Sequence, residues 1–132
     1  MKTTKYELRT PSRDAMIYIT PQVQRTVSEA GVRDGLATIY VPHTTAGVTI
    51  NENADPAVRQ DMAAVLDRLV PWSDGYAHDE GNSAAHVKAS LMGFTAARST
   101  IGCELLMPAS MPPAWFVGLV KPKVGVSRNA GS

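Results

Sequence analysis

The chain has 132 residues, a formal net charge of +1 and a single cysteine. This length suits one domain with its own core, and one cysteine excludes an intrachain disulfide. Because the charges nearly balance and the basic residues are scattered, we expect no nucleic acid or membrane as partner. The first ten residues carry no apolar core of signal-peptide type, and no apolar run approaches a membrane span. We therefore expect a cytoplasmic protein.

The chain begins with two predicted strands and a helix. Residues 4–10 and 14–19 are rich in alternating or β-branched residues, which indicates strands. Thr20 followed by Pro21 is typical of a helix start, with the threonine as the capping residue. Gly31 is expected to end this helix.

The middle of the chain predicts two strands and a long helix. The run 36–41 is almost wholly apolar or β-branched, which predicts a central strand, and a second strand follows at 48–50. Asp55 is a capping residue with Pro56 at the first helical position, and the helix is expected to run to Val70. Its expected buried face consists of Val58, Met62, Val65, Leu66 and Leu69.

The last third of the chain has weaker patterns. Residues 82–93 predict a short helix, and 101–107 and 115–120 are candidate strands. The tail at 121–132 is expected to be frayed. Because helices and strands do not alternate strictly, we predict a single α+β domain over 1–132, with a mainly antiparallel sheet and helices packed on one face.

The three histidines lie in two short polar segments. His43 follows the predicted strand at 36–41, His78 lies in a loop, and His86 lies on the helix that begins near Asn82. Three imidazoles can hold a divalent metal, zinc or magnesium, and leave a position open for water or substrate. The spacing matches no zinc motif. A structural role, such as capping a strand or pairing with a nearby carboxylate, is therefore an open alternative for each histidine.

A phosphate-binding role is suggested by the same region. The helix that starts at Asn82 has a glycine before it, and a free helix N-terminus attracts anions. Lys88 lies further along this helix and adds positive charge, while Thr44 and Thr45 supply hydroxyl groups to the other segment. We expect Thr44, Thr45 and Lys88 to contact a small phosphorylated molecule. The alternative is that this helix end binds only water.

The two segments also resemble a known family. HTTAGVTINENADP at 43–56 and HDEGNSAAHVKASLMG at 78–93 are similar to the two signature segments of the YjbQ family, also called the secondary thiamine-phosphate synthase enzyme family. The resemblance covers residues 1–93. After Gly93 the chain departs from the pattern, because the strands that carry LGTWQ and EFDGPR in family members have no counterpart here.

The resemblance implies a YjbQ-like α+β fold, a homotrimer and a cleft that can hold a metal ion. The activity linked to the family joins a pyrimidine diphosphate to a thiazole phosphate and gives thiamine phosphate and diphosphate; the family name implies a side activity. Carried over residue by residue, the cleft would comprise His43, Glu52, His78, Glu80, Asn82 and His86.

These observations lead to two hypotheses of different classes. The first is a metal-dependent transferase of the thiamine-phosphate type, in which His43, His78 and His86 hold the metal beside the leaving diphosphate. Its expected catalytic residues are Glu80, Glu52 and Asn82. Metal-assisted hydrolysis in the same cleft is a variant of this hypothesis. The second hypothesis is a non-catalytic protein that binds a metal or a phosphorylated metabolite.

Overall fold

The structure is a computed structural model that describes residues 1–102, 104–105 and 113–120. The single cysteine, Cys103, and the tail at 121–132 lie outside the described residues, so the predictions made for them are not addressed by it.

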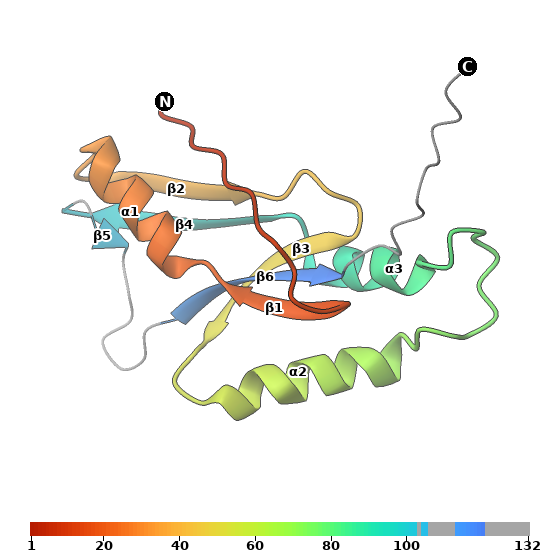
Figure 1. The fold of residues 1–132 in the computed structure, drawn as a ribbon. Coiled ribbons are helices and arrows are strands. Elements are labelled where there is room, and N and C mark those ends of the chain that lie inside the picture. The colour runs from red at the N-terminus through yellow and green to blue at the C-terminus, as the bar shows by residue number, and fades with distance from the viewer. Residues whose placement is uncertain (103, 106–112, 121–132) are drawn as a thin grey trace, which may run out of the picture.

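The described elements form two antiparallel sheets and three helices (Figure 1). One sheet has the strand order β1-β6-β3 and the other β2-β4-β5, and every pairing is antiparallel. The α+β class is therefore confirmed. In chain order the elements are β1 (Asp14–Tyr18), α1 (Thr20–Ala30), β2 (Gly35–Tyr40), β3 (Ala46–Glu52), α2 (Pro56–Leu69), α3 (Ser83–Met92), β4 (Thr95–Ile101), β5 (Glu104–Leu105) and β6 (Pro113–Val120).

Local chemistry accounts for the end of α1 and the start of α2, but not for the predicted cap of α1. Gly31 ends α1 with φ 66°, a left-handed conformation that glycine adopts without steric cost. Asp55 caps α2 by accepting a hydrogen bond from the Ala57 N–H at 2.8 Å. Thr20 is already the first helical residue and is buried; the cap position is Ile19, which makes no side-chain capping bond.

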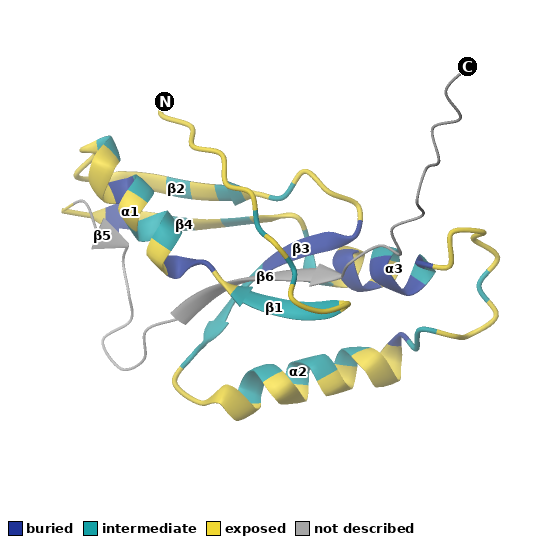
Figure 2. Cartoon of the chain, in the orientation of Figure 1, coloured by how far each residue is buried: buried dark blue, intermediate teal, exposed yellow. Residues whose placement is uncertain are grey.

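The core lies between α1 and the strands. Its buried members are Ile19, Val27 and Val48, and partly buried apolar residues of β1, β2, β3 and β4 pack around them. Figure 2 shows buried positions on α1, β3 and α3, whereas α2 is exposed or intermediate along most of its length. The core cluster therefore rests on α1 and β3, and α3 adds the buried residues Ala84, Ala85 and Ala89.

The helices lie on two sides of β3, because neighbouring side chains of a strand point to opposite faces. Val48 points toward the core cluster with α1. On the other face, a Cβ at Gly47 would meet the Met92 Cβ of α3 at 2.8 Å. Asn51, on the same face as Gly47, donates from Nδ2 to the Met62 Sδ of α2 at 3.2 Å. Along β3, the core cluster with α1 therefore packs on Val48, whereas α3 and α2 contact Gly47 and Asn51.

The strand predicted at 4–10 is wrong, and the strand predicted at 36–41 is present as β2 but in another position than expected. Residues 4–10 form no strand; instead the Tyr6 hydroxyl donates to the Gln22 carbonyl of α1 at 3.1 Å, and Leu8 packs on the core. β2 is not central but lies at the end of its sheet order, beside β4. Its outward side chains Leu36 and Tyr40 are 67% and 63% exposed. β4, a strand of mostly small residues, was not predicted.

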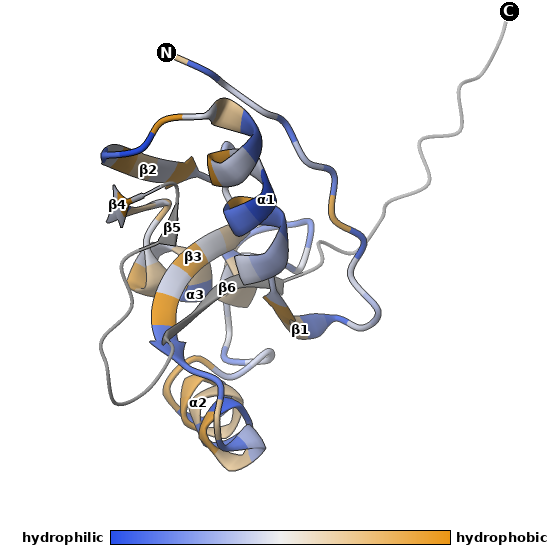
Figure 3. Cartoon of the chain, turned by 90° about the vertical axis from the view of Figure 1, so that its left-hand side faces the viewer, coloured by the Kyte–Doolittle hydropathy of each residue, from blue (hydrophilic) through white to orange (hydrophobic). Residues whose placement is uncertain are grey.

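The predicted buried face of α2 is only partly covered. Val65 and Leu69 are exposed, no residue of the helix is fully buried, and Val58, Met62 and Leu66 are half-buried. Figure 3 shows α2 below the sheets, with hydrophobic positions on its surface. Among helices in the described part of the chain, α2 is the longest at 14 residues. None of them meets the length and apolarity of a membrane span.

The contact between β3 and α3 generates a stability prediction. A methyl group at Gly47 would lie 2.6 Å from the Gly93 carbonyl oxygen, which is backbone and cannot move aside cheaply. We expect Gly47→Ala to lower the free energy of unfolding by about 1–3 kcal/mol, measured by urea denaturation. Gly35→Ala is the matched control, since its new Cβ would meet only side-chain atoms, the end of Val32 at 3.0 Å and the Thr100 hydroxyl oxygen at 3.7 Å. Equal midpoints for the two variants would contradict this account of the packing.

Candidate functional site

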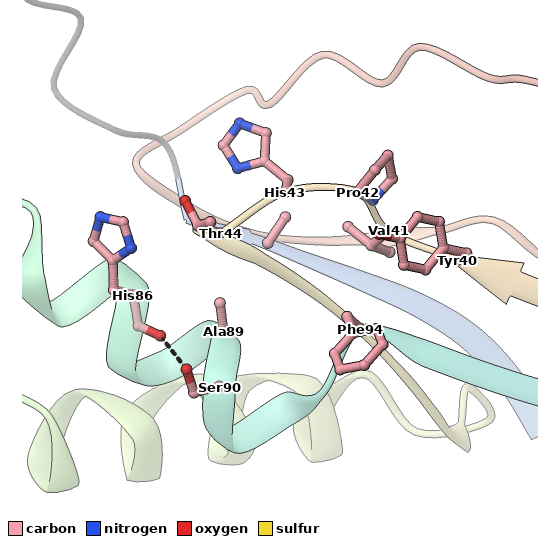
Figure 4. Close-up of a pocket in the computed structure, with 10 residues that line it drawn as sticks. Tyr40, Val41, Pro42, His43, Thr44, His86, Ala89, Ser90 and Phe94 are labelled. Carbon is pink, nitrogen blue, oxygen red and sulfur yellow. Dashed lines mark hydrogen bonds between the residues drawn. The ribbon is translucent and has the colours of Figure 1, made fainter.

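A hollow of about 860 Å³ lies between the loop after β2 and the side of α3 (Figure 4). Backbone bonds hold its two walls together: the Val41 N–H donates to the Phe94 carbonyl at 2.8 Å, and the Val48 N–H to the Gly93 carbonyl at 2.9 Å. The lining residues are Tyr40, Val41, Pro42, His43, Thr44, Ala46, His86, Ala89, Ser90 and Phe94.

The hollow has two chemically different ends. Tyr40 and Phe94 form an edge-to-face pair at one end, with ring centroids 6.0 Å apart. The imidazoles of His43 and His86 and the hydroxyl of Thr44 lie at the other end (Figure 4). An aromatic wall suits a flat ring, whereas imidazole and hydroxyl groups suit a polar or anionic group. Two predicted metal ligands and one predicted substrate contact therefore share one hollow.

His43 is fixed by the residue two positions on. Its Nδ1 accepts a hydrogen bond from the Thr45 backbone N–H at 3.1 Å, and the Thr45 hydroxyl oxygen lies 3.0 Å from the same nitrogen. Thr45 is 2% exposed, so it is not free to contact a ligand. Its predicted role as a substrate contact is corrected to that of a residue that orients His43.

His78 lies beside His86 rather than in the wall of the hollow. The two rings are in edge contact, with centroids 5.5 Å apart. The His78 Nε2 is 3.7 Å from the Glu80 Oε2, and Glu80 is 71% exposed at its side chain. Among the described residues, no three His, Cys, Asp or Glu side chains are placed to hold one ion. The arrangement does not fit a three-histidine centre, and the predicted divalent metal stays a prediction.

Asn82 is buried at the start of α3, with 2% of its surface exposed. Its Nδ2 donates to the Glu80 Oε2 at 3.3 Å, while its Oδ1 has no hydrogen-bond partner in the described part of the chain. Ala84 and Ala85 are also buried, so the first turn of α3 is covered. The hollow instead borders the later turns of the helix, where His86 and Ser90 lie. The predicted anion site at the N-terminus of α3 is therefore not open to this hollow.

Glu52 lies at the opposite end of β3 from the histidine loop. Six residue steps separate it from Ala46, which is a distance of about 20 Å along a strand. Its backbone N–H donates to the Asn51 side chain at 2.8 Å. Within one copy of the chain, Glu52 is therefore not brought to His43 and His86, and its predicted catalytic role finds no support in this arrangement.

Lys88 is buried on another side of α3, away from the hollow. Its side chain is 3% exposed, and its Nζ pairs with Asp14 of β1 at 3.2 Å and with Asp67 of α2. The ammonium also lies 4.9 Å from the centre of the Trp72 ring, whose Nε1 donates to the Asp14 carboxylate at 2.9 Å. The predicted substrate contact is corrected, because this charge already joins three elements.

Sequence comparison assigns the chain to a family. The model of the YjbQ family, described as UPF0047 protein YjbQ-like, matches residues 4–105. This chain belongs to the YjbQ family. The family match extends past Gly93, so the likeness covers more of the chain than the two signature segments indicated.

Relatives in the YjbQ family span archaea and bacteria. A UPF0047 protein of Methanocaldococcus jannaschii is 52% identical over 89 residues, which cover 67% of this chain and 64% of that protein. The UPF0047 protein YugU of Bacillus subtilis is 50% identical over 88 residues, covering 66% of this chain and 67% of that protein. The chain thus matches slightly less than two thirds of the archaeal relative's length.

The YjbQ fold is also found in solved structures. A crystal structure of an uncharacterised YjbQ/UPF0047 protein from Clostridium acetobutylicum superposes with a TM-score of 0.84 at 42% identity. The match covers 89% of this chain and 91% of that one. The YjbQ-like architecture predicted from the two signature segments is therefore confirmed well beyond Gly93.

Sequence reasoning missed the aromatic end of the YjbQ hollow. Tyr40 ends β2 three residues before His43, and Phe94 directly follows Gly93, the last residue of the second signature segment. Ser90 was also missed; it lines the hollow, but its hydroxyl donates to the His86 carbonyl at 2.9 Å. The proximity of both aromatics to the two signature segments was the available signal.

The buried ammonium of Lys88 generates a stability prediction. Removing both partners, Asp14→Asn with Asp67→Asn, leaves a buried cation without compensation and should cost about 3 kcal/mol or more. Lys88→Met should cost less, because the side chains of Asp14 and Asp67 are 29% and 50% exposed and retain water. Urea denaturation compares the variants, with Asp61→Asn on the exposed side of α2 as control. A larger loss of stability in Lys88→Met than in the double aspartate variant would show that the carboxylates, not the ammonium, depend on this cluster.

Proposed function

We propose that the hollow binds a flat heterocycle that carries a phosphate or diphosphate group, and that the chain is a small-molecule transferase of the thiamine-phosphate type in the cytoplasm. The observation that carries this proposal is the two-ended hollow. Tyr40 and Phe94 offer an aromatic wall for a ring, while His43, Thr44 and His86 offer polar groups for phosphate oxygens. Both proposed substrates, a pyrimidine diphosphate and a thiazole phosphate, combine these two features.

The proposed reaction requires little covalent chemistry from the chain. The bond between the pyrimidine methylene carbon and the diphosphate oxygen breaks, and the diphosphate leaves with the electron pair. The thiazole nitrogen supplies the electron pair of the new carbon–nitrogen bond. His86 and Thr44 would donate hydrogen bonds to the departing oxygens, which stabilises the charge that develops there. The aromatic wall would hold the two rings in contact, which favours the reaction by orientation.

A non-catalytic binding protein is the second candidate, and a specific observation favours it. Among the residues that the structure describes, no carboxylate lines the hollow. Glu52 lies at the far end of β3, and Glu80 is largely exposed beside Asn82. A hollow with imidazoles but no carboxylate can bind a phosphorylated metabolite without turning it over.

We also propose that the chain forms the homotrimer that the family resemblance implies. The outward face of the sheet that contains β2 and β4 carries Leu36 and Ile101, which are 67% and 59% exposed. A solvent-facing sheet surface normally carries polar residues at these alternating positions. Exposed apolar residues gathered on one face are typical of a surface that another protein covers, and further copies of this chain are the proposed cover.

The function proposal predicts ligand binding and turnover by the full chain. We expect thiamine phosphate and diphosphate to form from the two precursors, and turnover to fall about a hundredfold or more in His86→Ala, with Gln60→Ala on α2 as control. The assay is run in EDTA and again with added zinc or magnesium, so that a metal requirement appears as activity only with the ion. Binding without turnover would favour the second candidate, and no binding of either precursor would contradict both.

The assembly proposal predicts a mass three times that of one chain in sedimentation equilibrium. Leu36→Glu should shift the population toward single chains, because a buried unpaired carboxylate opposes association. Leu69→Glu is the matched comparison, since Leu69 is equally exposed, at 68%, but lies on α2. A monomeric parent chain would contradict the trimer, and dissociation by Leu69→Glu alone would place the contact on α2 instead.

A further inference from the structure

The hydrogen bonding of His43 determines which of its ring nitrogens faces a ligand. The backbone N–H of Thr45 donates to Nδ1 at 3.1 Å, and the Thr45 hydroxyl oxygen lies 3.0 Å from the same atom. A backbone N–H can only donate, so Nδ1 must be the acceptor and cannot carry a proton. Because Thr45 is 2% exposed, it holds this donor in a fixed position.

This contact fixes the tautomer of the ring. A neutral imidazole carries one proton, so when Nδ1 accepts, the proton is on Nε2. A protonated Nε2 has no lone pair in the ring plane to offer to a metal. Histidines that bind metals show the opposite arrangement, in which the nitrogen away from the metal donates its N–H to an acceptor. The surroundings of His43 therefore suit a hydrogen-bond donor and oppose a metal ligand.

The Nε2–H of His43 has no partner in the described part of the chain. The residue is exposed and its ring borders the hollow (Figure 4). Its contacts with Thr45 occupy only the other nitrogen. Thr44, also exposed, adds a hydroxyl next to it. No carboxylate is among the described residues that line the hollow, so this N–H is open to water or to an oxygen of a bound ligand.

We propose that His43 is a hydrogen-bond donor to an oxyanion of the ligand, a phosphate or diphosphate oxygen, and not a metal ligand. The choice of phosphate rests on the proposed function, whereas the donor state of the ring follows from its contacts with Thr45. The inference changes the expected site: His43 binds and orients the anionic end of the substrate. A bound divalent ion would have to be held without it.

The tautomer can be measured on the free full chain, without any ligand. Nitrogen-15 NMR of histidine-labelled protein distinguishes the two neutral tautomers by the two-bond couplings of each ring nitrogen. We expect His43 to be in the Nε2–H form when neutral. His78 and His86 serve as internal references, since no backbone N–H donates to their rings among the described residues. A predominant Nδ1–H form of His43 would overturn the inference.

The ligand is tested with inorganic pyrophosphate in EDTA, by calorimetry. His43→Gln places an amide donor near the position of Nε2 and should bind within about threefold of the parent chain, whereas His43→Ala should bind about tenfold more weakly or worse. Equal losses in both variants would overturn the donor role. If the parent chain does not bind pyrophosphate, the phosphate ligand of His43 is overturned, whereas the proposed function is decided by the assay with the two precursors. The NMR result would still decide the state of His43.

Discussion

The close approach of α3 to β3 at Gly47 is the contact on which the candidate site depends. The absence of a side chain there lets Met92 and the Gly93 carbonyl lie against the strand, and the Val48 N–H bonds to that carbonyl at 2.9 Å. His43 lies four residues before this contact, on the loop that leads into β3, and His86 lies on the helix that the contact positions. A larger residue would separate the two walls of the hollow.

On the far side of α3, buried ion pairs hold the helix against its neighbours. The Lys88 ammonium is buried against Asp14 of β1 and Asp67 of α2, so one cation joins three elements that are distant in sequence. α2 has no fully buried residue, and polar contacts are correspondingly important for its position. Burial of a charge is tolerated only where partners compensate it. Lys88, which was predicted to contact a phosphate, therefore helps to hold α3, the helix that carries His86.

Local chemistry made much of the fold predictable. Asp55 with Pro56 and the glycine at 31 define helix ends through bonds and dihedral angles within a few residues, and these predictions were confirmed. Predictions that depend on distant neighbours were the ones that were wrong. The strand at 36–41 looked central because it is apolar, but its position at the end of a sheet order depends on β4, which is built of small residues without a strong pattern. The half-exposed face of α2 likewise depends on what packs against it.

The sequence by itself determined the family, the α+β class and the two segments that supply the hollow, because motifs and helix ends are encoded by adjacent residues. Only the tertiary structure decided what each residue in those segments does. It brought His43 and His86 to one hollow, added Tyr40 and Phe94, and gave Lys88 other partners. It also placed Glu52 at the remote end of β3 and turned Nδ1 of His43 toward a backbone donor. These outcomes depend on distances and directions between side chains, and spacing along a chain does not contain them.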